Sequence, residues 1–176
     1  LMEKYLSEEE ITPDEIKGAL KRGCFENAFV PTLCGSAFKN KGVQRVLDAV
    51  IDFLPSPTDV GSIEGSSVDN PEELVQIQNS VDGSFAALAF KIATDPFVGK
   101  LTYIRVYSGV LKKGSFCIDS NTGDKQRVSR ILQMHANKRE ELDEAKAGEI
   151  VAVIGLKDVR TGHTLSEKGD VTLESM

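Results

Sequence analysis

Apolar residues in the first third of the chain recur at the spacing of one helical face. From Val43 to Leu54 they stand at i, i+3, i+4, i+7, i+8 and i+11, which predicts an amphipathic α-helix. Pro55 and Pro57 follow directly, and proline ends a helix because it lacks the backbone N–H and clashes with the preceding turn. The stripe consists of Val43, Val46, Leu47, Val50, Ile51 and Leu54.

Two capping patterns precede this helix. Thr12 is followed by a proline and then, at the third helical position, by Glu15, which predicts a helix that starts at Thr12 and stops near Gly23. Ser7 and Glu10 have the same spacing and predict another capped start. We expect the helix after Thr12 to bury Ile16, Ala19 and Leu20.

Between the predicted helices, residues 28–34 form a short run that is almost entirely apolar. Such a run is typical of a strand buried on both faces of a parallel sheet, although Pro31 would remove one ladder donor. Strand, loop and amphipathic helix make half of a βαβ unit. Because half a unit cannot form a sheet, we expect the partner strands to lie outside this chain.

The second half of the chain has a different pattern of apolar and polar residues. Residues 59–83 contain Gly61, Gly65, Pro71 and four serines but no basic side chain, so they are predicted to be an extended, partly mobile linker. From residue 84 onward, short β-rich runs separated by glycine or proline turns predict a small closed barrel. The runs are 85–94, 101–107, 115–119, 126–133 and 149–154.

Charge is distributed unevenly along the chain. The net charge is −6, yet residues 84–139 hold 10 basic and 3 acidic side chains, and residues 140–176 hold 4 and 9. A local basic stretch of this kind attracts phosphate backbones by counterion release. The alternative interpretation is a solvated Lys/Arg face without a partner.

Motifs for catalysis are absent. The sequence has no G-x-S-x-G, no H-E-x-x-H and no G-x-x-x-x-G-K-[ST], and neither His135 nor His163 has ligand-spaced neighbours. The three cysteines, Cys24, Cys34 and Cys117, are too scattered for a zinc site or a disulfide framework and indicate a cytoplasmic protein. The sequence has no membrane-span pattern and no secretory signal. Its first residue is Leu1, from which we expect a processed chain or an expressed fragment.

The most informative loop is 34–42, at the carboxyl end of the predicted parallel strand, where open α/β sheets bind ligands. Small residues there would present a backbone N–H that can donate to a carbonyl such as guanine O6. An ordinary strand-to-helix turn accounts for the same residues.

The loop and its surroundings resemble a known family. Pro-Thr-Leu-Cys-Gly-Ser-Ala-Phe-Lys-Asn-Lys-Gly-Val-Gln at 31–44, with Leu-Pro-Ser-Pro at 54–57, is similar to elongation factor G, a translational GTPase. The resemblance implies that Ser36, Ala37 and Phe38 line the guanine pocket of the intact protein. The phosphate-binding loop, D-x-x-G and N-K-x-D are missing, so this piece would hold only one wall of the pocket.

The second half carries an independent resemblance to the second domain of the same family. Phe-Ala-Ala-Leu-Ala-Phe-Lys at 85–91, Asp-Pro-Phe-Val-Gly-Lys-Leu at 95–101 and Met-His-Ala-Asn-Lys-Arg-Glu at 134–140 carry it, and His163 departs from the family's usual Asp. The fold implied is an α/β end of a P-loop GTPase sheet (1–58), a linker (59–83) and an all-β barrel (84–176). Residues 171–176 resemble the entry into a third domain.

The resemblance implies a parent protein that uses GTP to move tRNA and mRNA through the ribosome. GTP or GDP and Mg²⁺ would act in the intact protein, while this piece is expected to bind neither and to be inactive, because the residues for phosphoryl transfer lie upstream. The second domain of the family touches small-subunit ribosomal RNA, and with 6% aromatic residues we expect contact with its backbone rather than its bases. The candidate contacts are Lys112, Lys113, Lys125, Arg127, Arg130, Lys138 and Arg139.

Two alternatives remain. One is a related translational GTPase, such as a ribosomal protection protein or a peptide-release factor; the other is a stand-alone RNA-binding barrel. In either case no membrane partner is expected. Apolar surface left uncovered in residues 1–58 is expected to favour self-association of the fragment.

Overall fold

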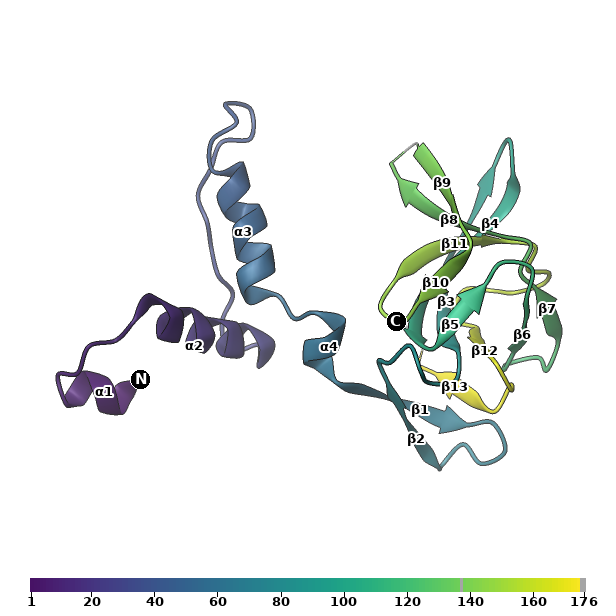
Figure 1. Cartoon of the computed structure of the whole chain (residues 1–176), viewed down its shortest axis with the longest axis horizontal. Helices are drawn as coiled ribbons and strands as arrows, with labels where there is room; N and C mark the ends of the chain where they lie inside the picture. Colours follow the sequence, from purple (N-terminus) through teal and green to yellow (C-terminus); the bar gives the residue numbers. More distant parts are fainter. Residues whose placement is uncertain (137, 175–176) are drawn as a thin grey trace. The chain divides into compact units, whose positions relative to one another are not determined.

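The structure is a computed structural model that describes residues 1–136 and 138–174. Asn137, which belongs to the 134–140 motif, and the last two residues of the 171–176 segment lie outside the described residues. The chain divides into two compact units, Leu1–Asp59 and Val60–Met176 (Figure 1).

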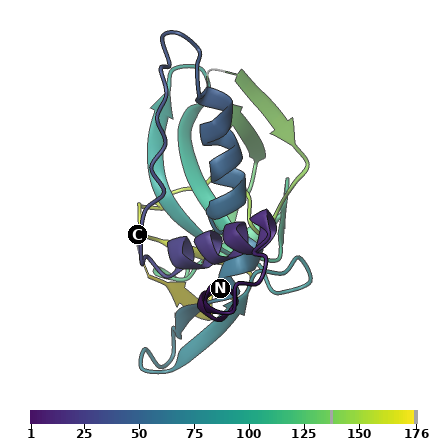
Figure 2. The same ribbon diagram turned by 90° about the vertical axis from the view of Figure 1, so that its left-hand side faces the viewer.

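Helices supply the regular structure of the first unit. They are α1 (Met2–Leu6), α2 (Pro13–Phe25), α3 (Val43–Phe53) and the short α4 (Pro57–Val60) at the unit boundary. The predicted capping box is present, because the Thr12 hydroxyl accepts from the Glu15 N–H at 3.3 Å and the Glu15 carboxylate accepts from the Thr12 N–H at 3.0 Å. Helix α2 runs across the C-terminal end of α3, where Lys17 pairs with Asp52 at 3.0 Å (Figure 2).

Three predictions for this unit are wrong. Ser7 ends α1 instead of starting a helix. Residues 28–34 form no strand, since a strand needs a hydrogen-bonding neighbour and the described residues of this unit provide none. The helix after Thr12 ends at Phe25, near Gly23 as predicted, but no residue of it is buried, so Ile16, Ala19 and Leu20 do not form the expected core. The apolar stripe of α3 is likewise exposed.

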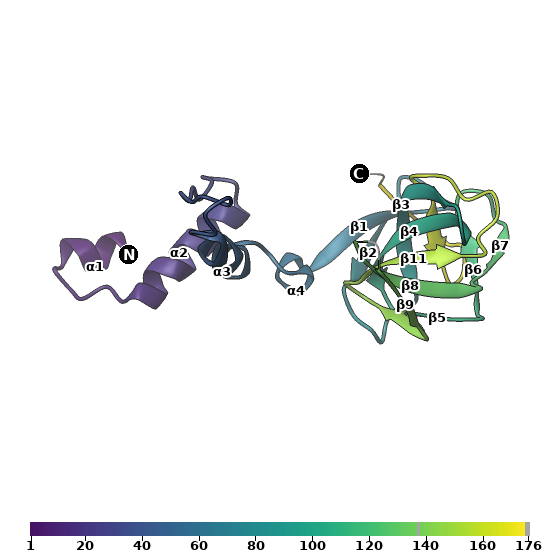
Figure 3. The ribbon, with the colours of Figure 1, turned by 90° about the horizontal axis from the view of Figure 1, so that it is seen from above.

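The second unit consists of short antiparallel strands. They are β1 (Ser62–Ser67), β2 (Leu74–Gln78), β3 (Ala86–Asp95), β4 (Gly99–Ser108), β5 (Val110–Lys112), β6 (Phe116–Asp119), β7 (Lys125–Arg127), β8 (Arg130–His135), β9 (Lys138–Leu142), β10 (Glu144–Lys146), β11 (Ile150–Ile154), β12 (Thr164–Ser166) and β13 (Val171–Leu173). Eight of them form one sheet in the order β7-β6-β12-β3-β4-β11-β8-β9, of which β4, β11, β8 and β9 are seen one after another in Figure 3. A pair, β10-β5, and a three-stranded sheet, β13-β1-β2, complete the unit.

The large sheet curls back on itself. Strands β7 and β8 lie far apart in the sheet order, yet only Val128 and Ser129 separate them in the chain. The Ser129 N–H donates to the Ile154 carbonyl at 2.8 Å, and the Gly114 N–H donates to the Val128 carbonyl at 2.7 Å. These two bonds attach the junction to the end of β11 on one side and to the turn before β6 on the other. The result is a β-barrel arrangement in which the predicted single run 126–133 is split into two strands.

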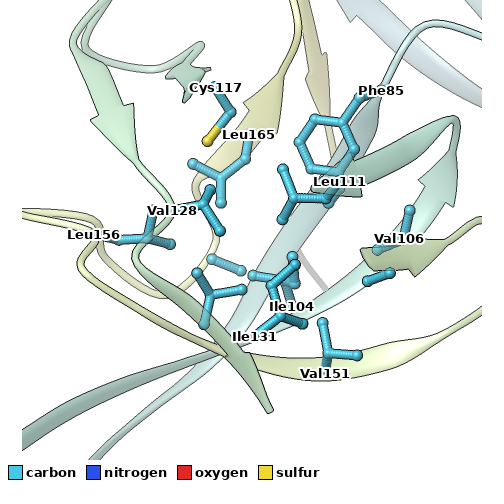
Figure 4. Close-up of a cluster of buried hydrophobic side chains, with 14 of the residues drawn as sticks. Phe85, Ile104, Val106, Leu111, Cys117, Val128, Ile131, Val151, Leu156 and Leu165 are labelled. Carbon is cyan, nitrogen blue, oxygen red and sulfur yellow. The ribbon is translucent and has the colours of Figure 1, made fainter. Parts of the chain in front are cut away.

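Fully buried side chains from most strands meet inside the barrel (Figure 4). Leu165 comes from β12, Ile104 from β4, Ile131 from β8 and Val151 from β11, all at most 1% exposed. Alternation along the strands sends these residues inward and their neighbours outward. This cluster is the main core of the second unit, whereas the helices of the first unit bury no residue.

Residues 59–83 are not an extended linker. They contain β1 and β2, which pair with each other from Ser62↔Gln78 to Ser66↔Leu74, and β1 also pairs with β13. The polar composition of this segment predicts a linker, but an apolar residue anchors it. Ile77, 8% exposed, packs in a second apolar cluster beside the barrel. Tertiary pairing here overrides weak local β-propensity.

Candidate nucleotide-binding loop and nucleic-acid surface

The loop that carries the predicted guanine wall is a tight hairpin. The Ser36 N–H donates to the Lys41 carbonyl at 2.8 Å, and the Lys41 N–H donates back to Ser36 at 3.0 Å. Asn40, at φ 50°, turns the chain, and its N–H reaches the Ala37 carbonyl at 3.0 Å. Asparagine accepts this left-handed conformation more readily than most residues.

Two glycines form the neck of this hairpin. A Cβ at Gly35 would lie 2.9 Å from the Lys41 carbonyl oxygen, and one at Gly42 would lie 3.0 Å from the Cys34 oxygen. Gly42 also has φ 79°, where side chains are strained. The two chain segments can therefore approach this closely only because both positions lack a side chain.

The three predicted wall residues lie in the turn of this hairpin rather than after a strand. Ser36 is half-buried, Ala37 is exposed and the Phe38 side chain is 100% exposed. Among the described residues, no backbone carbonyl accepts from the Ala37 N–H. The tripeptide thus presents a backbone donor without a backbone partner among the described residues, next to an exposed aromatic ring.

On the barrel, two of the seven predicted RNA contacts share one strand face. Lys125 and Arg127 flank the buried Gln126 on β7, so their side chains leave the same side of the strand. Phe116, opposite Arg127 on β6, is 54% exposed, and the Lys125 Nζ lies 4.4 Å from its ring centroid. We call Phe116, Lys125 and Arg127 the β7 face.

Two other candidates are already paired within the protein. Lys113 lies 2.6 Å from the Glu141 carboxylate, and the hydrogen bond and charge of Glu141 raise the Lys113 pKa above its usual value. Arg139 pairs with Asp95 and lies 5.8 Å, measured from its guanidinium carbon, from the centroid of the Phe97 ring. Their charges are therefore partly neutralised locally.

The remaining candidates, Lys112 on β5, Arg130 on β8 and Lys138 on β9, have no ion-pair partner within the described part of the chain. Lys112 stands opposite Glu144 in the β5–β10 pair. The seven basic residues thus come from four strands and the turn after β5, and the structure brings them together only in part.

Sequence reasoning missed the two aromatic rings beside these cations. Phe116 and Phe97, the latter 86% exposed, provide stacking surfaces that a low aromatic content seemed to rule out. For Phe116 a signal existed, because it alternates with the buried Cys117 along a predicted strand. For Phe97 the signal was its place in a turn, where Asp95 accepts from the Phe97 and Val98 N–H groups.

His163, at the position where the sequence departs from the family, has a specific partner. Its Nδ1 lies 2.7 Å from Oδ2 of Asp119, a carboxylate whose side chain is 1% exposed. The other Asp119 oxygen accepts from the Asn121 N–H at 3.0 Å. The pair ties the β6 end to the loop before β12 and serves the fold.

Within the described residues, no helix is both long and apolar enough to cross a membrane. The same residues contain no group of three or more His, Cys, Asp or Glu side chains arranged to hold a metal ion.

Comparison with known proteins gives a match for part of this architecture. Residues 99–166, from β4 to β12, match the family model described as Elongation factor Tu domain 2. A crystal structure of a protein from Thermus thermophilus matches with a TM-score of 0.69 and 26% identity, over 94% of this chain. The chain spans 22% of the length of that protein. These likenesses support a chain related to the translational GTPases, with a barrel of the second-domain type.

Proposed function

We propose that the chain is part of an elongation factor of the G type, which uses GTP to move tRNA and mRNA through the ribosome. One observation carries the proposal: the Ser36–Phe38 motif precedes, in one chain, a barrel whose residues 99–166 match Elongation factor Tu domain 2. Neither part alone is as specific as the two in this order. The match to a single protein over 94% of the chain supports reading them together.

Each part has its own proposed role. The Ala37 N–H would donate to guanine O6, and the narrow neck at Gly35 and Gly42 would hold that donor in place. The β7 face would contact the phosphate backbone of small-subunit ribosomal RNA. GTP, GDP and Mg²⁺ belong to the intact protein, whose other segments would supply phosphate and metal contacts.

A ribosomal protection protein or a peptide-release factor would also contain the Ser36–Phe38 motif followed by the barrel. The sequence upstream of this chain would discriminate between these proteins and an elongation factor of the G type. The test is the intact mass of the native gene product together with its upstream sequence. We expect a protein about four to five times as long as this chain, as the 22% coverage indicates, with a phosphate-binding loop upstream. A native product of about this length would instead support a stand-alone barrel.

A second test concerns the fragment itself. Titration of the 176-residue chain with a fluorescent guanine nucleotide is expected to show no binding at micromolar concentrations, since one wall without phosphate contacts provides little affinity. Saturable micromolar binding would contradict the assignment of Ser36, Ala37 and Phe38 to an incomplete pocket.

A further inference from the structure

A cavity of about 590 Å³ lies in the second unit, beside the barrel and outside both sites described above. Its walls come from β1, β2, β13 and the segment that leads into β3. The volume falls in the range of roughly 300–1,000 Å³ that small-molecule sites occupy. Much of the wall belongs to residues 59–83, which polar composition alone would assign to a linker.

All the charged side chains that line the cavity are acidic. Asp82 and Asp170 line the cavity, and no Lys, Arg or His does. Neither carboxylate forms an ion pair with any residue that the structure describes. This contrasts with the basic stretch 84–139 in the same unit and disfavours an anionic ligand such as a phosphate.

The hydroxyl of a largely buried serine also faces this space. Ser108 lines the cavity and is 5% exposed as a residue, and its hydroxyl is accessible and makes no hydrogen bond to the described residues. Its Oγ points at Gly83, another lining residue, where a Cβ would come within 2.4 Å. The hydroxyl is not enclosed as the unpaired Thr102 hydroxyl is, so it is open to the cavity and a ligand there can hydrogen-bond to it.

The floor of the cavity is apolar. Ile77 and Val171, both 8% exposed, belong to the small cluster that packs β1, β2 and β13 against the start of β3. Two unpaired carboxylates, an oxygen without a partner and an apolar floor together match one ligand chemistry. That chemistry is a cationic hydrogen-bond donor on a short aliphatic stem.

We propose that this cavity binds an organic cation, either a free amine or guanidine or the arginine side chain of an extended peptide. The peptide source has a place to dock, because β2 is the outer strand of the sheet β13-β1-β2 and no described strand pairs with its other edge. The free-cation source needs only the cavity. Both sources use the same carboxylates.

The test is an NMR titration of the full 176-residue chain with three probes. A blocked pentapeptide with a central arginine represents the peptide, agmatine represents the free cation, and the same peptide with citrulline removes the charge but keeps the shape. We expect saturable shifts of the Gly83 and Ser108 amides with a Kd on the order of 1 mM for arginine or agmatine, and at least about tenfold weaker binding of citrulline. The preferred probe identifies the source.

Matched variants locate the site. The double variant Asp82→Asn with Asp170→Asn keeps the side-chain sizes and is expected to weaken binding at least about tenfold, and Ser108→Ala to weaken it less. Asp124→Asn, an exposed aspartate of the same unit outside the cavity, serves as the control and leaves binding unchanged. Absence of binding by both cations up to about 10 mM, equal binding of citrulline, or equal loss in the Asp124 control would each overturn the proposal.

Discussion

The side chain of Thr102 is expected to destabilise the folded state. Its hydroxyl is buried without a hydrogen-bond partner among the described residues, in the middle of β4. We expect Thr102→Val to raise the free energy of unfolding by about 1 kcal/mol, because an unpaired buried polar group is replaced by a methyl of similar shape. Urea unfolding followed by circular dichroism measures the change.

Thr164 provides the matched control for Thr102. It is equally buried, but its hydroxyl accepts from the Leu173 N–H at 2.8 Å. Thr164→Val should therefore lower the free energy of unfolding by about 1–3 kcal/mol, since the amide loses its partner. Equal effects of the two substitutions would show that hydrogen bonding does not decide the difference.

The cysteines should differ sharply in reactivity. Burial of Cys117, with a smaller contribution from nearby Asp119, raises its thiol pKa to about 12, whereas Cys34 is exposed. Only the thiolate attacks alkylating reagents, so native protein at about pH 8 should label at Cys34 and spare Cys117. Mass spectrometry of the alkylated protein measures this, and comparable labelling of Cys117 without denaturant would contradict the packing of the barrel core.

At the scale of elements, the start of α2 depends on pH. The hydrogen bond from Lys4, followed by those from the Thr12 backbone and side chain, lowers the Glu15 pKa from 4.5 to about 2. Because the folded pKa lies below the unfolded one, the contribution to helix stability is complete above pH 4.5 and is lost as the pH falls toward 2. An NMR titration of the Glu15 carboxyl carbon should give a midpoint near 2, and Lys4→Gln should move it upward.

The β7 strand is the element on which RNA contact depends in this account. Replacing Lys125 and Arg127 together by Gln should reduce the slope of log affinity against log salt by about two, because two phosphate contacts are lost. Lys113→Gln is the control, since its ammonium is already paired with Glu141 and a smaller effect is expected. Filter binding to small-subunit ribosomal RNA across a salt series measures both, and equal slopes for all three proteins would exclude the β7 face.

The sequence predicts an element well when the residues that stabilise it are neighbours in the chain, and poorly when they are distant. The α2 capping box, the α3 stripe and strands β3, β4, β6 and β11 follow from caps, periodicity and turn glycines, all read within a few residues, whereas the short strands β5, β9 and β10 are not predicted. Strands β1, β2 and β13 do not follow in this way, because β1 is mostly polar and pairs with β13 across about a hundred positions, from Gly65↔Leu173 to Ser67↔Val171. The loop predicted at 34–42 is a hairpin closed between Ser36 and Lys41, whereas the strand predicted before it does not form, because no described strand pairs with residues 28–34.

At the scale of the whole molecule, the two units should differ in resistance to proteolysis. The second unit has a buried core, whereas the helices of the first leave the α3 stripe exposed. Limited proteolysis of the purified chain should remove the first unit and leave a product that begins near Val60, because β1 and β2 belong to the barrel unit. N-terminal sequencing identifies the boundary, and a product beginning near residue 80 would mean that β1 and β2 detach from it.

Affinity for the two ribosomal subunits, measured side by side, tests the proposed role most directly. The fluorescently labelled chain is titrated with isolated small and large subunits at several salt concentrations, and the fraction bound is read by anisotropy. We predict saturable binding to the small subunit that weakens steeply with salt, and much weaker binding to the large one. No binding to either subunit, or equal binding to both, would contradict the account.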